Sequence, residues 1–250
     1  MDLYNYNGEK ISNSLYGKKL SILGDSISTY NGYIPSGYDN YYPSGDVDNV
    51  SKTWWMKLIN KSGMTLLKNA SWSGSQISGD MSTAYAGCSD VRINALKDGS
   101  TLPDIIIVYI STNDWVRSVE TGVYTSTENV DTSSTTISNI SDAYALMLYK
   151  LRTTYPAARV YCLTNLEGRT TTDVVFPILN HNGESIHNVN HAIAEIAHIF
   201  GAKVIDLQTC GIHFWNIASY TTDGRIHPNT AGMEIIADTI YKQLAADFGT

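Results

Sequence analysis

Residues 105–114 read IIIVYISTND, a run of six apolar residues followed directly by four polar ones. The apolar run has the length of a strand and falls far short of the roughly 18–20 residues that span a bilayer. A strand that is apolar on both faces is typical of a parallel sheet covered on both sides. We therefore expect Asp104–Ile110 to be a buried strand, with polar residues at its carboxyl end.

Four further β-rich runs alternate with helical patterns. The expected strands are Lys19–Leu23, Thr65–Lys68, Arg159–Leu163 and Lys203–Asp206. Apolar residues at steps of three and four indicate one face of a helix, and such patterns begin at Trp54, Ile140, Ile186 and Met233. The alternation predicts an α/β fold with a parallel sheet and helices on both faces. In such sheets ligands bind beyond the carboxyl ends of the strands, at the point where the strand order reverses.

The composition limits the function classes. Hydrophobic residues make up 43% and charged residues 16% of the 250, as in ordinary folded proteins. The net charge is −7 and no Lys/Arg cluster occurs, which argues against nucleic-acid binding. No apolar run is long enough to span a membrane. We expect one domain over residues 1–250, with residues 1–17 as an N-terminal extension or edge segment; the oligomeric state stays open.

The cysteines and the N-terminus indicate no particular function or compartment. Cys88, Cys162 and Cys210 are odd in number and widely spaced, so we expect buried thiols rather than a disulfide framework or a zinc site. The first residues, MDLYNYNGEK, contain no basic n-region and apolar h-region, so no signal peptide is expected. The compartment therefore stays open between secreted and cytoplasmic.

Two segments that follow strands contain candidate catalytic groups. Gly24–Ser28 includes Ser26, and a serine directly after a strand can begin a helical turn, where backbone N–H groups stabilise negative charge. Asn69–Ser75 includes Gly74, whose backbone N–H an oxygen atom can approach closely because glycine has no side chain. Each segment alone is also typical of an ordinary turn or helix cap.

Two later segments add an amide and a base. Ser111–Asp114 includes Asn113, whose side-chain amide can donate a hydrogen bond to a developing oxyanion. Asp223–Asn229 places His227 just before the last helical pattern, with the carboxylate of Asp223 four residues earlier. A hydroxyl becomes a good nucleophile only when a base removes its proton, so this histidine completes the chemistry that a serine needs.

In this order, the four segments resemble the sequence blocks of the SGNH hydrolases, also called GDSL esterases/lipases. Block I is Gly24–Ile27, with Ile where Leu is common, and block II is Asn69–Gly74. Block III is Ser111–Asp114, with Ser in place of the usual Gly, and block V is Asp223–Asn229. The resemblance runs from about Lys18 to the C-terminus. It implies a flavodoxin-like, three-layer α/β/α sandwich around five parallel strands.

The resemblance also implies an esterase that needs no metal or organic cofactor. Ser26 would attack an ester carbonyl and His227 would act as its base, with Asp223 as the third member. The backbone N–H groups of Ser26 and Gly74 and the amide of Asn113 would form the oxyanion hole. Water would then cleave the acyl-enzyme.

The acid and the base depart from the family spacing. The family usually has Asp-x-x-His, whereas three residues separate Asp223 from His227 and Gly224 stands at the usual position of the acid. Two arrangements stay open. A bulged turn can still bring Asp223 to the imidazole, or a backbone carbonyl can hold the imidazole while Asp223 only shapes the turn.

Aromatic residues crowd the segments expected around the site. The chain has 17 Tyr and 5 Trp, and residues 30–42 read YNGYIPSGYDNYY. Flat aromatic surfaces with polar edges suit sugar rings. We therefore expect a small-molecule or oligosaccharide ester, with a short-chain, acetyl ester on a carbohydrate favoured. The predicted substrate-binding residues are Asp25, Tyr33, Tyr38, Trp54, Trp72 and Trp115.

Three alternatives remain. Glu184, His187 and His191 lie on one side of a helical pattern, as in a metal hydrolase, but they do not form His-Glu-x-x-His, and a solvated helix flank explains them better. An inactive carbohydrate-binding module of the same fold is favoured only by the shifted Asp223. An acyltransferase would use the same residues and would differ in excluding water.

Overall fold

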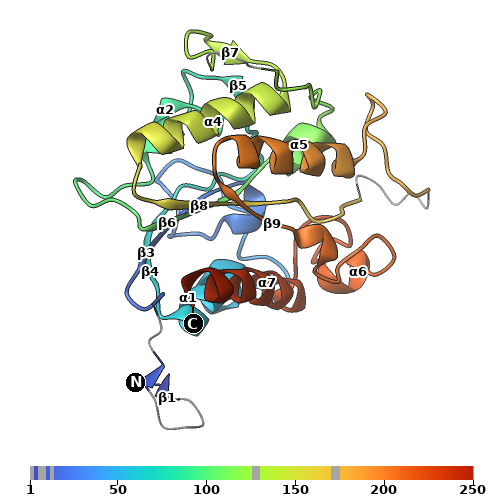
Figure 1. Ribbon diagram of the computed structural model, residues 1–250. Helices are drawn as coiled ribbons and strands as arrows, with labels where there is room; N and C mark the ends of the chain where they lie inside the picture. Colours follow the sequence, from blue (N-terminus) through green and yellow to red (C-terminus); the bar gives the residue numbers. More distant parts are fainter. Residues whose placement is uncertain (1–2, 5–9, 12–13, 126–129, 170–174, 250) are drawn as a thin grey trace.

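The computed structural model describes residues 3–4, 10–11, 14–125, 130–169 and 175–249. Residues 126–129, before the helical pattern that begins at Ile140, lie outside this part, as does most of the expected N-terminal extension. Figure 1 shows a sheet between two layers of helices, with β1 (Leu3–Tyr4) below them.

Five parallel strands form the central sheet, in the order β4-β3-β6-β8-β9. They are β3 (Lys19–Gly24), β4 (Thr65–Asn69), β6 (Ile105–Tyr109), β8 (Arg159–Leu163) and β9 (Lys203–Ile205). All five predicted strands are confirmed to within one residue at each end. In chain order the arrangement is 2-1-3-4-5, the flavodoxin-like order, which reverses between β3 and β6.

Helices cover both faces of the sheet. On one side lie α2 (Asp90–Asn94), α4 (Ile140–Thr154) and α5 (Ile186–Ile199), and on the other lie α1 (Trp54–Ser62) and α7 (Thr230–Phe248) (Figure 1). Short helices follow several strands or loops: η1 (Ser26–Ser28), η2 (Val50–Lys52), α3 (Thr112–Val116), η3 (Leu207–Thr209) and α6 (Ile217–Tyr220). The predicted three-layer fold is therefore confirmed.

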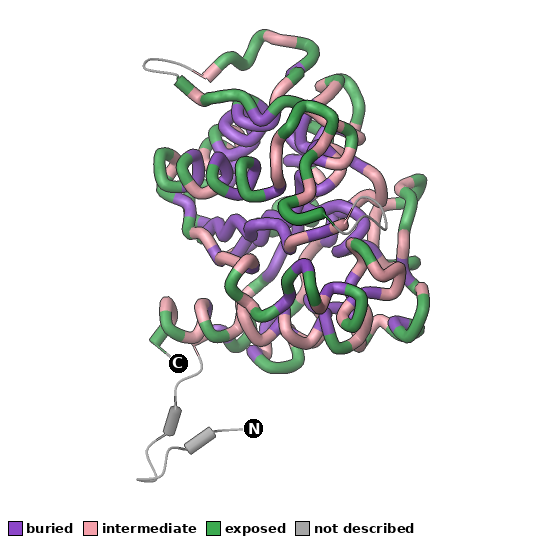
Figure 2. Tube along the Cα trace, turned by 90° about the vertical axis from the view of Figure 1, so that its right-hand side faces the viewer, coloured by how far each residue is buried: buried purple, intermediate pink, exposed green. Residues whose placement is uncertain are grey.

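The central strand β6 divides the core into two apolar clusters. Ile106 and Val108 pack in the cluster that includes buried residues of α4 and α5. Ile105, Ile107 and Tyr109 pack in the other cluster, which includes buried residues of α1 and α7. Because successive side chains of a strand point to opposite faces, one apolar run supplies both layers. Figure 2 shows the buried residues inside and the exposed residues on the outer turns.

Two small antiparallel pairs lie outside the central sheet. β1 (Leu3–Tyr4) pairs with β2 (Lys10–Ile11), so these residues form an extension and not an edge strand of the sheet. β5 (Gly79–Asp80) pairs with β7 (Thr136–Ile137). Among the described residues, no helix has both the length and the apolar character needed to cross a membrane.

The three cysteines are free thiols. Cys88 and Cys162 are buried, as expected, whereas Cys210 is only partly buried. Burial raises the pKa of both the Cys88 and the Cys162 thiol to about 12, so neither has the character of a nucleophile.

Candidate active site

The turn after β3 presents Ser26 as the first residue of η1. The side chain of Asp25 caps this turn by accepting a backbone N–H at 3.1 Å. Gly24 is required just before it, because a Cβ there would lie 2.7 Å from the hydroxyl oxygens of both Ser28 and Ser71. The close approach of these two serines fixes the direction in which the turn leaves the sheet.

The turn before α7 presents His227. Asp223 Oδ1 accepts hydrogen bonds from three successive backbone N–H groups, those of Arg225, Ile226 and His227, at 2.8, 2.9 and 3.2 Å. Gly224 has φ +71°, the left-handed region that glycine adopts without strain. The turn thus absorbs the additional residue between the acid and the base.

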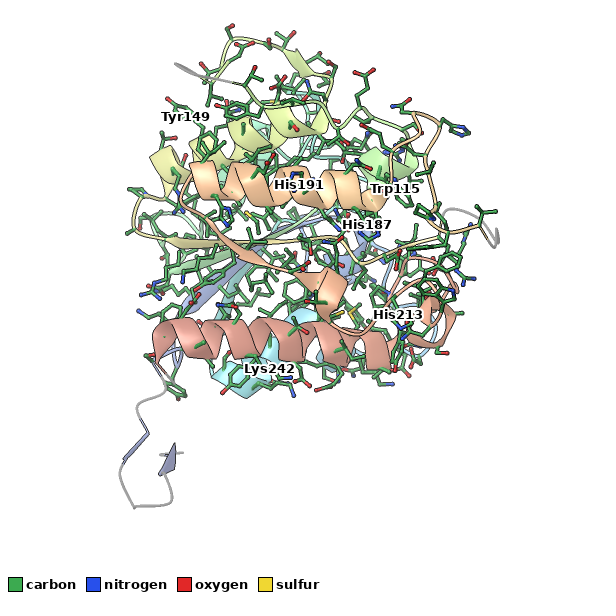
Figure 3. All side chains as sticks on the ribbon, turned by 45° about the vertical axis from the view of Figure 1, so that its right-hand side comes forward. Trp115, Tyr149, His187, His191, His213 and Lys242 are labelled. Carbon is green, nitrogen blue, oxygen red and sulfur yellow. The ribbon has the colours of Figure 1, made fainter. Side chains whose placement is uncertain are left out.

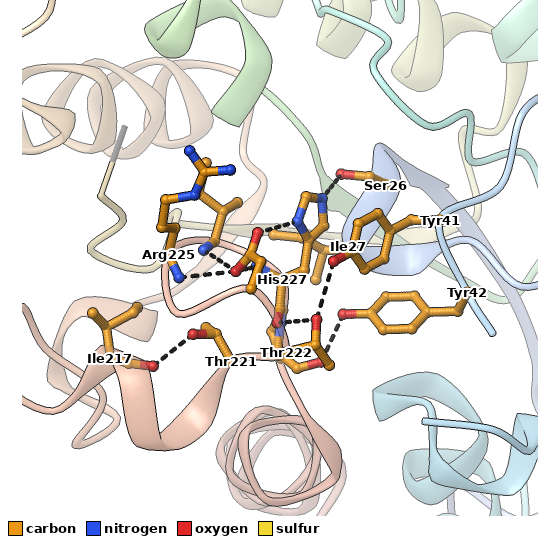
Figure 4. Close-up of polar contacts among 12 residues, drawn as sticks. Ser26, Ile27, Tyr41, Tyr42, Ile217, Thr221, Thr222, Arg225 and His227 are labelled. Carbon is orange, nitrogen blue, oxygen red and sulfur yellow. Dashed lines mark hydrogen bonds and ion pairs between the residues drawn. The ribbon is translucent and has the colours of Figure 1, made fainter. Parts of the chain in front are cut away.

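These two turns bring three side chains into one hydrogen-bonded chain (Figure 4). His227 Nε2 lies 2.9 Å from Ser26 Oγ, and His227 Nδ1 lies 2.6 Å from Asp223 Oδ2. Of the two arrangements left open by the sequence, the structure has the one in which Asp223 reaches the imidazole. The spacing therefore gives no support to an inactive module.

The environment of Asp223 defines the tautomer of His227. Burial alone would raise the pKa of Asp223, but hydrogen bonds from His227 and from the Ile226 and Arg225 N–H groups hold it well below its usual range. An ionised carboxylate only accepts, so Nδ1 of the imidazole donates to it. In the neutral ring Nε2 is then the acceptor, and it faces the hydroxyl of Ser26.

The predicted oxyanion donors come from the turn after β3, the segment after β4 and the helix α3. Gly74 has φ +79°, and the N–H groups of Ser26 and Gly74 find no acceptor among the described residues. Asn113, in α3, is partly exposed and donates one amide hydrogen to the carbonyl of Ser75 at 3.0 Å. Since an amide nitrogen carries two hydrogens, the second is free for a ligand.

Two side chains that sequence reasoning missed hold Gly74. The hydroxyl of Tyr85 and Nη1 of Arg117, the latter at 2.8 Å, both donate to the carbonyl of Gly74. The Arg117 guanidinium also lies over the Tyr85 ring, 5.7 Å from its centroid. Nothing in the local sequence distinguishes these residues from ordinary surface residues, because only the folded chain brings them to the glycine.

Three of the predicted substrate-binding residues are buried, which corrects that prediction. Trp54 is fully buried and donates from Nε1 to Ser28 Oγ at 3.2 Å. Trp115 is 1% exposed and donates to the carbonyl of Glu184 at 3.0 Å. Asp25 is fully buried, and burial raises its pKa to about 6. These side chains build the site and present no surface to a ligand.

The other three predicted aromatics reach the surface. Tyr33 is 41% exposed and packs on Trp55. Tyr38 and Trp72 are partly exposed and stack with ring centroids 4.3 Å apart and planes at 18°. The indole N–H of Trp72 donates to Asp39 Oδ2 at 3.2 Å. This stacked pair therefore combines a flat apolar surface with a polar edge.

The side chains of the metal-hydrolase alternative do not converge. His187 lies 3.4 Å from Glu167, and both carboxylate oxygens of Glu184 accept the Thr121 N–H. His191 lies 3.3 Å from Glu195, farther along α5 (Figure 3). Across the described part of the chain, no three His, Cys, Asp or Glu side chains could hold a metal ion. A concavity of about 850 Å³ runs along α5, and neither Ser26 nor His227 lines it.

The flavodoxin-like sheet carries the serine turn where its strand order reverses, after β3. Comparison with known proteins indicates the same class: the protein is a hydrolase that acts on esters. The family model described as GDSL-like lipase/acylhydrolase matches residues 18–244. The chain belongs to this family.

Solved structures support the same placement. A protein from Bacteroides uniformis described as a GDSL-like lipase is 29% identical, with a TM-score of 0.68 over 92% of this chain and 96% of that one. A similarly described protein from Bacteroides ovatus is 26% identical, with a TM-score of 0.67 over 92% and 99%. A carbohydrate esterase family 3 protein from Talaromyces cellulolyticus, 18% identical with a TM-score of 0.56 over 93% and 98%, shares the fold. None of the curated proteins compared matches the chain.

Proposed function

We propose that the protein hydrolyses a short-chain, acetyl ester of a carbohydrate through an acyl-enzyme on Ser26. The observation that carries this proposal is the hydrogen-bonded chain from Ser26 through His227 to Asp223, with distances of 2.9 and 2.6 Å. A base in contact with the hydroxyl, itself oriented by a carboxylate, is the arrangement that makes serine a nucleophile.

In the proposed mechanism, Ser26 Oγ attacks the ester carbonyl while His227 Nε2 takes its proton. The carbonyl oxygen becomes negative and is held by the N–H groups of Ser26 and Gly74 and by the Asn113 amide. Loss of one such donor typically costs about 2.7–4 kcal/mol of transition-state stabilisation. His227 then protonates the leaving alcohol, and water, activated by the same imidazole, releases the acid from the acyl-enzyme.

The stacked pair of Tyr38 and Trp72 supports a carbohydrate substrate. The indole of Trp72 stands two residues before Gly74, so a group bound against it lies next to the proposed oxyanion hole. Its partly exposed face can contact the C–H groups of a sugar ring, and Asp39 beside it can accept a hydroxyl hydrogen. A long acyl chain would gain little from this polar edge.

Release of p-nitrophenol from acetate and octanoate esters, measured in chelator, tests the chemistry. Wild type should turn over acetate faster than octanoate. Ser26→Ala should lose about a thousandfold or more in kcat, and Asp223→Asn a comparable amount because the imidazole loses its orienting acceptor. Equal hydrolysis by wild type and Ser26→Ala would overturn the proposed mechanism.

Acetylated xylan tests the substrate. Trp72→Ala should raise KM for acetyl release from xylan about tenfold, as expected for the loss of one aromatic contact, and leave the rate on p-nitrophenyl acetate within about twofold. Tyr149→Ala is the matched control, because Tyr149 is 40% exposed on α4, away from the site (Figure 3). If both variants deacetylate xylan as wild type does, the carbohydrate part of the proposal is wrong.

A further inference from the structure

The ring of Tyr41 lies flat on the imidazole of His227 (Figure 4). The ring centroids are 3.5 Å apart and the planes differ by 7°. The edges of the imidazole are already used, since Nδ1 contacts Asp223 and Nε2 contacts Ser26. These two hydrogen bonds hold the imidazole at its edges but do not prevent it from tilting out of its plane. Tyr41 packs against its face and restrains this tilt.

Hydrogen bonds at both ends of Tyr41 hold it in this position. Its hydroxyl lies 3.1 Å from Thr222 Oγ1, and Thr222 donates to the carbonyl of His227 from N–H at 2.7 Å and from its hydroxyl at 3.2 Å. Because the single Thr222 hydroxyl hydrogen goes to that carbonyl, the Tyr41 hydroxyl is the donor to Thr222. The aromatic side chain is thereby tied to the turn that carries the base.

The backbone of Tyr41 is tied to the other catalytic turn. Its N–H donates to Thr29 Oγ1 at 2.9 Å, and the Thr29 hydroxyl donates to the carbonyl of Ser26 at 2.8 Å. One residue therefore links the turn of the nucleophile to the turn of the base, although these turns lie 201 positions apart in the chain.

The face of an aromatic ring attracts a cation, so this stack favours the protonated imidazole. The other titratable groups around His227 are Asp223 on its own turn, the buried Asp25 from the nucleophile turn, and Tyr42, which donates to the carbonyl of Pro228 at 2.6 Å. Substitution of Tyr41 removes none of these groups, and Tyr41→Phe also keeps the ring that contacts Tyr42.

We propose that Tyr41 is a positioning residue, which orients His227 and stabilises its imidazolium form when the proton leaves Ser26. This inference rests on the proposed function, because it treats His227 as the base. It accounts for a residue that the sequence does not single out, since Tyr41 is one of several tyrosines within residues 30–42.

The test combines NMR spectroscopy with kinetics on p-nitrophenyl acetate, in wild type, Tyr41→Leu and Tyr41→Phe. The imidazole signals of His227 are identified by their loss in His227→Gln. In wild type they should show the upfield ring-current shift of a stacked aromatic. Tyr41→Leu should lose this upfield shift, whereas Tyr41→Phe should keep it.

The kinetic constants separate positioning from binding. Tyr41→Leu should lower kcat by about ten- to a hundredfold with KM changed less than about twofold, because a base that is slightly misplaced loses rate and not affinity. Tyr41→Phe keeps the ring and should retain most of kcat. Tyr149→Leu, at an exposed tyrosine of α4, is the control and should behave as wild type.

An unshifted His227 signal in wild type overturns the inference even if Tyr41→Leu fails to fold. So does a Tyr41→Leu variant that loses the upfield shift and keeps the wild-type kcat. Failure of the proposed function looks different, because Ser26→Ala would then keep the wild-type rate while the NMR signals of His227 still report the stack.

Discussion

Ser111 holds a backbone conformation that favours glycine. Its φ is +111°, at the point where β6 passes into α3, and the related family blocks usually have glycine here. The Ser111 hydroxyl accepts a hydrogen bond from Asn165 Nδ2 at 2.9 Å, which offsets part of the strain. A non-glycine residue in such a region costs of the order of 1–2 kcal/mol.

Two substitutions at this position separate strain from hydrogen bonding. Ser111→Gly and Ser111→Ala both lose the bond to Asn165, but only the glycine variant relieves the strain. We expect Ser111→Gly to exceed Ser111→Ala in free energy of unfolding by about 1 kcal/mol. Urea denaturation of the two variants measures this difference. Equal stabilities would mean that the backbone is not strained at Ser111.

Asp25 makes stability depend on pH. Burial raises its pKa to about 6, against the lowering effect of the hydrogen bond from the Ile27 N–H and of the nearby His227. Between about pH 4 and pH 6 the folded chain therefore keeps a proton that the unfolded chain has released. Stability that is fully present below about pH 4 is lost as the pH rises through 6.

Asp25→Asn removes this titration and keeps an acceptor for the capping N–H. The free energy of unfolding of the variant minus that of wild type should rise by about 3 kcal/mol from pH 4 to pH 7. The substitution also changes the surroundings of the buried Arg92, which stays charged throughout this pH range. That effect is the same at every pH, so it does not contribute to the change with pH. Denaturation at several pH values provides the measurement, and a constant difference would contradict the prediction.

At the scale of elements, each candidate catalytic residue stands where a strand ends or a helix begins. Ser26 opens η1, Asn113 lies in the first turn of α3, and His227 precedes α7. The Asn229 side chain caps α7 by accepting the Gly232 N–H at 3.0 Å. The start of the last helix thereby fixes the end of the turn that presents His227.

Asn229→Ala removes this cap and should lower the free energy of unfolding by about 1 kcal/mol. Asn229→Asp keeps the acceptor and places a negative charge at the helix N-terminus, so it should retain most of the wild-type stability. Thermal denaturation by circular dichroism compares the three proteins. A loss as large in Asn229→Asp as in Asn229→Ala would show that the bond from the Asn229 amide to the carbonyl of Ser219 matters more.

The strands and the order of the site segments could be predicted because both follow from local patterns. Short apolar runs predicted each strand to within one residue, and parallel strands bring their carboxyl ends to one edge. The burial of Trp54 and Trp115 could not be predicted, because an aromatic residue beside a polar segment fits the core and the surface equally well. Tyr41, Tyr85 and Arg117 act through contacts distant in sequence, for which no spacing provides a signal.

At the scale of the whole molecule, two apolar clusters pack against opposite faces of the sheet. Leu148 of α4 and Ile240 of α7 are fully buried in opposite layers. The proposed active site lies at the edge of the sheet between both layers. His227 precedes α7, which covers one face of the sheet, and α4 and α5 cover the other face. The sequence predicts a single domain, and a single domain would unfold both layers together.

Leu148→Ala and Ile240→Ala test this cooperativity. Each leaves a cavity and should lower the free energy of unfolding by about 2–5 kcal/mol, without changing the dependence on denaturant concentration. Tryptophan fluorescence and circular dichroism should report one coincident transition in each variant. Two separate transitions, with each variant shifting only one, would show that the layers unfold independently.

The 201 positions between Ser26 and His227 also matter during biosynthesis. A ribosome makes the serine early and the histidine turn late. In the proposed mechanism, the Ser26 hydroxyl has no base while residues 223–227 are still unmade or inside the exit tunnel, so an ester would not acylate the growing chain. A fragment that ends before Asp223 would keep the Gly-Asp-Ser sequence and be equally inactive. Activity would therefore begin only when the turn that precedes α7 has been synthesised and has folded.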